Sequence, residues 1–311
     1  MNWPSLARSA LLALSLAATL PVHAAEPPRV VASIKPVHAL VAGVMAGVGT
    51  PEVVVSGAAS PHFYSLKPSD AARLDKAQVV FWMGEGLETY LAKPLSALAA
   101  RAQVVELMET SGLKTLPTRV GGTWKQDEDE DESDHDRHER IDAHLWLDIG
   151  NAQTLVERIA AVLAERDPAN ADAYRANAET MVRKLDDLDA ELAAALTPVK
   201  SRPFVVFHDA YQYFETRYGL TAVGAIAVSP EQRPGAKRVR DLRRRIKELG
   251  AVCVFAEPQF QPALIDTVVE GTGARTATLD PEGTRLAPGP DFYAALMRGL
   301  AASLTGCLAG P

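Results

Sequence analysis

The strongest constraint on the fold is a long helical repeat in the middle of the chain. From Pro168 to about Leu196, apolar residues recur at alternating steps of four and three, at Tyr174, Ala178, Met181, Leu185, Leu188 and Leu192. At 1.5 Å per residue such a helix would extend roughly 40 Å, about the span of two small lobes. The heptads are too few for a coiled coil. The segment is therefore predicted to connect two globular lobes.

Strand-like and helix-like segments alternate on both sides of this repeat. Strands are predicted at 30–34, 52–55, 79–83, 204–207, 252–256 and 274–279. Helices are predicted at 37–45, 68–76, 148–166, 211–218 and 291–304, with Asp148 as an N-cap. This alternation predicts an α/β protein of two Rossmann-like lobes with mainly parallel sheets. The expected division is an N-terminal lobe at 25–167, a connecting helix at 168–197 and a C-terminal lobe at 198–311.

The first 24 residues have the pattern of a signal peptide. Arg8 precedes a short apolar run from Ser9 to Leu20, and Val22-His23-Ala24 offers small residues at the −3 and −1 positions of a cleavage site. The mature chain is expected to begin near Ala24 or Ala25. No later apolar run approaches the ~18 residues of a membrane span. An exported protein without a membrane span is predicted, which makes nucleic acid an improbable partner.

The net charge of −7 comes from one short stretch. Of 39 acidic and 32 basic residues, nine and two lie between 127 and 140, which leaves 30 of each elsewhere. Residues 124–140 have no apolar periodicity, so a disordered acidic loop is predicted there.

Both cysteines, Cys253 and Cys307, lie in the last fifth of the chain. In an oxidising compartment an isolated pair of this kind indicates one disulfide. A thiolate metal site is the alternative, which export makes improbable.

Three histidines and one aspartate follow apolar segments at positions where a ligand could bind. His62 lies in the loop after the strand 52–55, His208 directly follows 204–207, and Asp280 ends the strand 274–279. His144 lies in a short apolar run just before a helix. In an open α/β sheet, ligands bind beyond the carboxyl ends of the strands. We therefore expect these four side chains to converge.

Three neutral imidazoles and one oxygen form a tetrahedral Zn²⁺ site, with Zn–N distances near 2.0–2.1 Å. Imidazole also suits copper and nickel, so the ligand types alone leave the metal open. Each ligating histidine needs an acceptor for its other ring N–H. Asp209 and Glu257 are the candidates for that role.

Five blocks of sequence resemble the zinc-binding proteins of bacterial ABC importers, the ZnuA type. They run in the family's order across the mature chain: SPHFYSLKPSD at 60–70, HLWL at 144–147, FHDAYQYF at 207–214, CVFAEPQF at 253–260 and LDP at 279–281. The first is similar to the family motif PHxYxLKPSD. Together the five blocks are highly specific.

The resemblance implies that His62, His144 and His208 are the metal ligands. A histidine in the third position suggests zinc, since manganese-type relatives place a carboxylate there. Some members have a glutamate directly before the first histidine and use it as the fourth ligand, but this chain has Pro61. The fourth position therefore goes to Asp280 or to water. The resemblance also implies a Cys253–Cys307 disulfide.

The function implied by the resemblance is capture of periplasmic Zn²⁺ between two lobes and delivery to a membrane permease, without enzymatic activity. The chain contains no GxxxxGK[ST] phosphate loop, so the permease and its ATPase are expected to be separate chains. A monomer is expected. A secreted zinc hydrolase is the main alternative, with Asp209, Glu257 or Asp280 as general base. A copper or nickel carrier is the second.

Two charged segments have weaker interpretations. Basic residues recur on one helix face at Arg233, Lys237, Arg240, Arg244 and Lys247, which is typical of a solvated amphipathic helix, although docking to a permease stays open. Residues 124–140 resemble an acidic, histidine-containing loop of zinc-specific members. We expect its His135 and His138 to collect cations loosely, or the loop to serve only solubility. His144 just beyond it is expected to be the essential residue.

Overall fold

Two parallel four-stranded sheets form the framework of the protein. The computed structural model describes residues 26–57, 59–119, 141–227, 235–260 and 262–310. The first sheet has the order β2-β1-β3-β4, with the strands β1 (Val30–Ile34), β2 (Glu52–Val55), β3 (Val79–Trp82) and β4 (Gln103–Glu106). The second has the order β6-β5-β7-β8, with β5 (Phe204–His208), β6 (Ala222–Ala227), β7 (Cys253–Ala256) and β8 (Arg275–Thr278). The predicted α/β class is confirmed.

The helices follow the strands in both halves of the chain. The first half contains α1 (Lys35–Val44), α2 (Pro68–Lys76), α3 (Thr89–Leu98) and α4 (Ile149–Arg166). The second half contains α6 (Gln212–Tyr218), α7 (Ala236–Glu248), α8 (Pro262–Val269) and α9 (Phe292–Leu308). Asp148 caps α4 as predicted, because its side chain accepts hydrogen bonds from the backbone N–H groups of Gly150 and Asn151.

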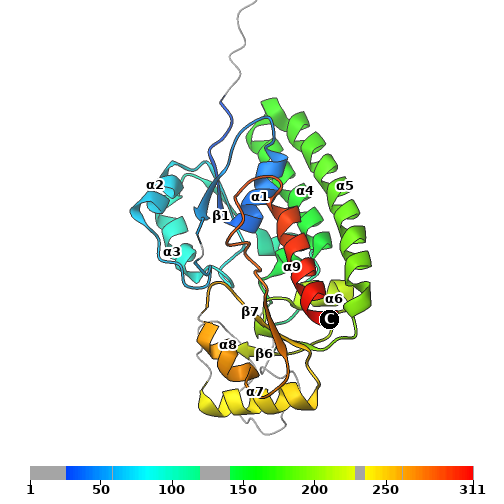
Figure 1. The fold of residues 1–311 in the computed structure, drawn as a ribbon. Coiled ribbons are helices and arrows are strands. Elements are labelled where there is room, and N and C mark those ends of the chain that lie inside the picture. Colours follow the sequence, from blue (N-terminus) through cyan, green and yellow to red (C-terminus); the bar gives the residue numbers. More distant parts are fainter. Residues whose placement is uncertain (1–25, 58, 120–140, 228–234, 261, 311) are drawn as a thin grey trace, which may run out of the picture.

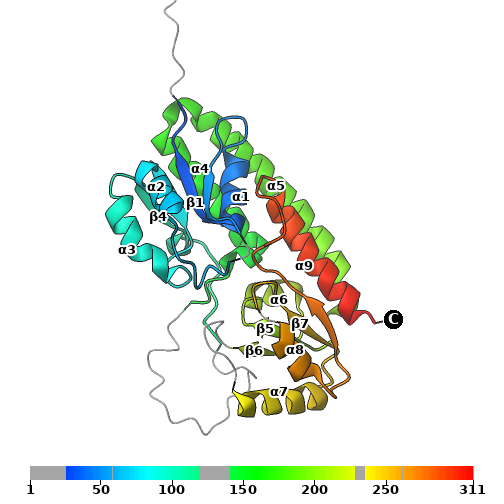
Figure 2. The same cartoon turned by 60° about the vertical axis from the view of Figure 1, so that its left-hand side comes forward.

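The predicted connecting helix is α5 (Ala171–Leu196), shown in green in Figure 1. Residues 168–170, predicted to open it, form a 3₁₀ turn instead. The predicted apolar seam is buried except at Met181, which is half-buried and lies against Gly43 of α1. Figure 2 shows α5 and α9 lying side by side along both halves of the molecule. The helix pair therefore links the two sheets.

Most of the buried apolar residues form one cluster that runs through both halves. A second, smaller cluster lies under α7 and α8 and includes Val254, Leu242, Ile246 and Val268. The apolar face of α7 thus faces the interior, and Lys237, Arg240, Arg244 and Lys247 on its other face are exposed. Arg233 lies outside the described residues. None of the described helices is long and apolar enough to cross a bilayer.

The predicted disulfide between Cys253 and Cys307 is present. It joins the first residue of β7 to the end of α9 across a sequence separation of 54 residues. Both cysteines are buried. The bond therefore fixes the last helix to the second sheet.

Residues 120–140, which contain the acidic run with His135 and His138, lie outside the described residues. The described residues on either side of this segment are held in place by hydrogen bonds. Pro117 and Ile141 form an antiparallel bridge. The Tyr213 hydroxyl of α6 accepts a hydrogen bond from the Leu116 N–H at 3.0 Å and donates one to the Asp142 carbonyl at 2.9 Å. The described residues that flank the acidic segment thus contact α6.

Candidate metal centre

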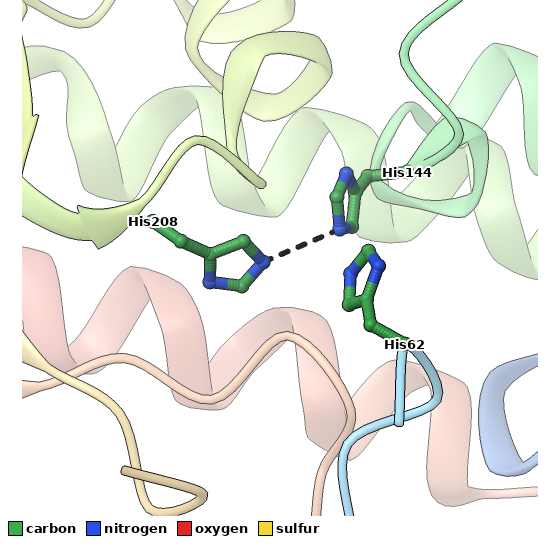
Figure 3. A group of neighbouring side chains, drawn as sticks. All are labelled: His62, His144 and His208. Atoms are coloured by element: carbon green, nitrogen blue, oxygen red, sulfur yellow. Dashed lines mark hydrogen bonds between the residues drawn. The ribbon is translucent and has the colours of Figure 1, made fainter. Parts of the chain in front are cut away.

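His62, His144 and His208 come together although they are far apart in sequence. His62 lies in the loop between β2 and α2, His144 directly precedes the 3₁₀ turn Leu145–Leu147, and His208 is the last residue of β5. Figure 3 shows the three rings turned toward one another. One nitrogen from each ring lies within 4.8 Å of the other two. The Nε2 atoms of His144 and His208 are 3.4 Å apart. The predicted convergence of these histidines is confirmed.

A buried carboxylate orients each of the two buried rings. Asp142 Oδ1 lies 2.7 Å from His144 Nδ1, and Glu257 Oε1 lies 2.7 Å from His208 Nδ1. Each carboxylate also accepts the backbone N–H of its histidine. Because Nδ1 is engaged in both rings, Nε2 is the nitrogen left for a metal.

Of the two acceptors expected from the sequence, Glu257 has that role and Asp209 does not. The Asp209 carboxylate instead accepts hydrogen bonds from Arg119, with 2.9 Å between Arg119 Nε and Asp209 Oδ2. Asp142 was not anticipated. Its signal was the spacing Asp-x-His, which places the carboxylate two residues before His144 in the same tight segment.

The third ring, His62, is held without a hydrogen-bonding acceptor. Its Nε2 is buried and has no hydrogen-bond partner among the described residues. Burial, together with the neighbouring His144 and His208 rings, lowers the pKa of His62 to about 2. The ring is therefore neutral at physiological pH, and its lone pair is available to a cation.

His208 has the opposite electrostatic environment. Burial alone would lower its pKa, but the Glu257 carboxylate beside Nδ1 outweighs this effect and raises the pKa above its usual value. The same carboxylate would stabilise a metal-bound imidazole, because it makes the ring more electron-rich. The His62 ring thus resists protonation, whereas the His208 ring binds a proton more readily than a free imidazole does.

The cavity between the rings is very small. Its volume is about 10 Å³, and its lining includes the three histidines together with Glu257, Gln259, Phe260, Pro281 and Glu282. A water molecule needs at least ~10–15 Å³ on this measure. The space therefore suits a single small ion or water, and an organic substrate does not fit.

Asp280 is close to this cavity in sequence but has a different set of contacts. Its Oδ2 accepts hydrogen bonds from the Thr284 N–H and hydroxyl, both at 2.7 Å. Its Oδ1 accepts from the Glu282 N–H at 3.2 Å and from Gln259 Nε2 at 3.4 Å. Among the described residues, the group with mutually close ligand atoms contains the three histidines and not Asp280. These bonds stabilise the turn at 280–284.

Two arginines join the segments that carry His144 and His208. Arg217 of α6 donates to Asp148, the N-cap of α4, at 2.8 Å and to Asp189 of α5 at 2.6 Å. Arg119 donates to Glu215 of α6 at 2.8 Å and also to Asp209. Both carboxylates bound by Arg119 are buried. The two arginines thus hold α6 against the first half of the chain.

This arrangement of three histidines between two parallel sheets has counterparts among known proteins. Residues 30–307 match the family model of ZnuA, described as the zinc-uptake complex component A, periplasmic. The chain belongs to the ZnuA family. That family is one of periplasmic solute-binding proteins for zinc uptake and not of enzymes.

Curated ZnuA relatives match over nearly their whole length. The high-affinity zinc uptake system protein ZnuA of Brucella abortus (strain 2308) is 47% identical, with 92% of this chain and 93% of the relative covered. The protein of the same name from Paracoccus denitrificans is 38% identical, with 96% and 98% covered. Both are named for zinc uptake.

A solved ZnuA structure has a similar fold. A zinc-bound crystal structure of a ZnuA deletion mutant lacking residues 138–173 of its own chain superimposes with a TM-score of 0.76 at 26% identity, covering 91% of this chain and 98% of that one. The family assignment therefore agrees in sequence and in fold.

Proposed function

We propose that the protein is a high-affinity zinc-binding protein that captures Zn²⁺ between its two sheets and delivers it to an ABC permease for import. The observation that carries this proposal is the convergence of three imidazole nitrogens within 4.8 Å of one another in a cavity with room for a single ion. The family relationship supports zinc as the ion that is transported.

The proposed ligands are His62, His144 and His208, with water completing a tetrahedral site. We place water before Asp280 at the fourth position, because both carboxylate oxygens of Asp280 already accept hydrogen bonds within its own turn. Pro61, directly before His62, has no side-chain atom that can coordinate a metal ion. Because all three proposed protein ligands are neutral imidazoles, they do not offset the 2+ charge of the bound zinc ion.

Competition between metals tests the function. The metal-free protein is titrated with Zn²⁺ and then challenged with Ni²⁺, Mn²⁺ and Cu²⁺ under matched conditions. We expect one Zn²⁺ per chain, bound more tightly than Mn²⁺, which prefers oxygen ligands, and than Ni²⁺, which prefers square-planar or tetragonal geometry to a tetrahedral site. If Ni²⁺ or Mn²⁺ displaced zinc at equal concentration, zinc would not be the transported ion. Mutation of His62, His144 or His208 that left binding intact would overturn the proposed site.

The affinity should depend on pH because protons compete with zinc for imidazole. Zinc binding is expected to weaken as the pH falls below about 6.5. The raised pKa of His208 makes this competition start at or above that value, whereas His62, with its pKa lowered to about 2, stays neutral. At pH 5.5 we therefore expect weaker binding than at pH 7.5 and the release of fewer than three protons per zinc.

Titration calorimetry in two buffers of different ionisation enthalpy measures both quantities. Equal zinc affinities at pH 7.5 and 5.5 would count against a site built from three histidines.

The acidic loop is proposed to raise the local concentration of cations without forming the tight site. Its His135 and His138 lie outside the described residues, so this role rests on composition and on family resemblance. Deleting residues 124–139 is expected to leave the zinc affinity close to that of the full chain, because the three proposed ligands and their carboxylate partners lie outside the deletion. Loss of high-affinity binding in this variant, measured by chelator competition, would refute the assignment.

The remaining features of the proposal concern the whole chain. We propose export to the periplasm with cleavage near Ala24/Ala25, and a mature monomer with lobes at 25–167 and 198–311 joined by 168–197. The membrane permease and its ATPase are separate polypeptides. Amino-terminal sequencing and size-exclusion chromatography with light scattering test the first two statements.

A further inference from the structure

Glu282 is a buried carboxylate at the metal cavity that none of the roles above uses. It is 7% exposed and lines the cavity together with the three histidines. Glu257 bonds His208, Gln259 bonds Asp280, and Ser60 Oγ accepts the His62 N–H. Glu257 Oε2 and Gln259 Oε1 have no further hydrogen-bond partner among the described residues. Within the described part of the chain, no hydrogen bond or ion pair to the Glu282 carboxylate is found.

The backbone around Glu282 is held from both sides by residues of the first half of the chain. Trp146 Nε1 donates to the Pro281 carbonyl at 3.0 Å. Lys35 Nζ donates to the Gly283 carbonyl at 3.2 Å and to the Thr284 carbonyl at 2.8 Å. Trp146 and Lys35 are both buried. Glu282 thus lies in a backbone segment that is fixed immediately before and after it.

Asp280 contributes to the same arrangement. Its carboxylate accepts the N–H of Glu282 itself and, two residues later, the N–H of Thr284. The turn that Asp280 stabilises therefore holds Glu282 at the lining of the cavity. The positive charge of Lys35 acts on Glu282, although no hydrogen bond or ion pair joins the two among the described residues. A buried carboxylate without a hydrogen bond is costly, so its position at an ion-sized cavity calls for a group that donates a hydrogen bond to it.

The geometry of the histidine group favours an indirect role for Glu282 over direct coordination. It is not part of the group whose ligand atoms lie within 4.8 Å of one another. A zinc-bound oxygen lies ~2.0–2.2 Å from the metal. A hydrogen bond between that oxygen and a carboxylate adds ~2.5–2.7 Å. A carboxylate that reaches the metal through one water therefore lies farther away than the histidine nitrogens, which agrees with the absence of Glu282 from the close group.

We propose that Glu282 accepts a hydrogen bond from the water molecule that completes the zinc site. This inference rests on the proposed function and specifies its fourth position. The carboxylate orients the water and adds negative charge beside a dication whose three protein ligands are neutral. Asp280 acts as a positioning residue for Glu282 and does not itself bind the metal.

Substitution of Glu282 tests the inference. Glu282→Gln keeps the size of the side chain and removes its charge, and Glu282→Leu also removes the acceptor. Asp167→Asn is the matched control, because Asp167 is a buried carboxylate that accepts a hydrogen bond from the Tyr174 hydroxyl at 2.8 Å. It is absent from the cavity lining and from the charges that act on Glu282. We expect Glu282→Gln to weaken zinc binding ~10–100-fold, the cost usual for an outer partner of a metal site. Glu282→Leu should weaken it at least as much, and Asp167→Asn should stay close to wild type.

Two further measurements separate this role from a structural one. Thermal unfolding of the metal-free variants should match wild type, and the visible spectrum of Co²⁺-loaded Glu282→Gln should keep the tetrahedral pattern of the wild type. Wild-type zinc affinity in both Glu282 variants, or an equal loss in Asp167→Asn, would overturn the inference. A changed coordination number in Glu282→Gln would also overturn it, by making Glu282 a direct ligand.

Failure of the inference about Glu282 can be distinguished from failure of the proposed function. If His62→Ala, His144→Ala and His208→Ala abolish zinc binding while both Glu282 variants bind normally, only the inference about Glu282 fails. If the histidine variants bind zinc as the wild type does, the proposed zinc site itself fails.

Discussion

Replacing His208 by alanine is expected to abolish high-affinity zinc binding. The substitution removes one of three protein ligands, so the loss should exceed the ~10–100-fold that outer partners of a metal site contribute. It also leaves the Glu257 carboxylate buried without the ring that it orients. Chelator competition with the metal-free protein measures the dissociation constant.

Glu257→Gln is expected to weaken zinc binding less than His208→Ala does. It keeps the imidazole of His208 but weakens the hydrogen bond at Nδ1, so a loss within the ~10–100-fold range is expected. His38→Ala serves as a control. His38 is buried and bonds the Pro51 carbonyl at 3.1 Å, and it is outside the histidine group. Tight zinc binding by His208→Ala would contradict the proposed coordination.

Removing the disulfide is expected to lower the free energy of unfolding by about 4 kcal/mol. The bond closes a loop with a sequence separation of 54 residues, and the reduced chain regains the entropy of that loop in the unfolded state. A Cys253→Ser/Cys307→Ser variant should therefore unfold at a lower urea concentration. Its zinc affinity should stay close to that of the wild type, because neither cysteine lines the metal cavity.

Reduction of the wild-type protein is the matched comparison, since it breaks the bond without changing a residue. The two forms should lose similar amounts of stability in urea titrations. A loss below about 1 kcal/mol in both, under the ~2–4 kcal/mol typical of native disulfides, would show that the closed loop does not restrict the unfolded chain.

The sequence predicted the strands that are rich in β-branched and aromatic residues, and it missed two others. β4, at 103–106, has polar residues at both ends, and Val104 is 39% exposed, as is usual at the edge of a sheet. β6, at 222–227, consists largely of Ala and Gly, which have low strand propensity. Both are edge strands, and pairing with β3 and β5 stabilises them more than local preference does.

The site was predicted more completely than its surroundings. The positions of His62 and His208 after strands indicated that each lies at the carboxyl edge of its own sheet, where ligands bind. The packing of the two sheets then brings the two histidines together. The partners of these rings were harder to predict. Asp209 and Glu257 both follow strands, and only the contact between β5 and β7 decides that Glu257 reaches His208 while Asp209 turns to Arg119. Such contacts depend on the packing of distant segments.

The interpretation of Asp280 shows the same limit. Asp-Pro-Glu-Gly is compatible with a ligand and with a turn, and the sequence left both open. In the structure, the Asp280 carboxylate accepts hydrogen bonds from the backbone at Glu282 and Thr284, which gives it a turn-forming role. A zinc-loaded structure decides between Asp280 and the water that we propose as the fourth ligand.

A crystal structure of the zinc-loaded protein, with anomalous data at the zinc edge, tests the central claim most directly. We predict one strong anomalous peak ~2.0–2.1 Å from a ring nitrogen of each of His62, His144 and His208. Water should complete the tetrahedron, with the Glu282 carboxylate within hydrogen-bonding distance of it. A peak at another location, or a zinc ion that one of these histidines does not contact, would contradict the proposed site.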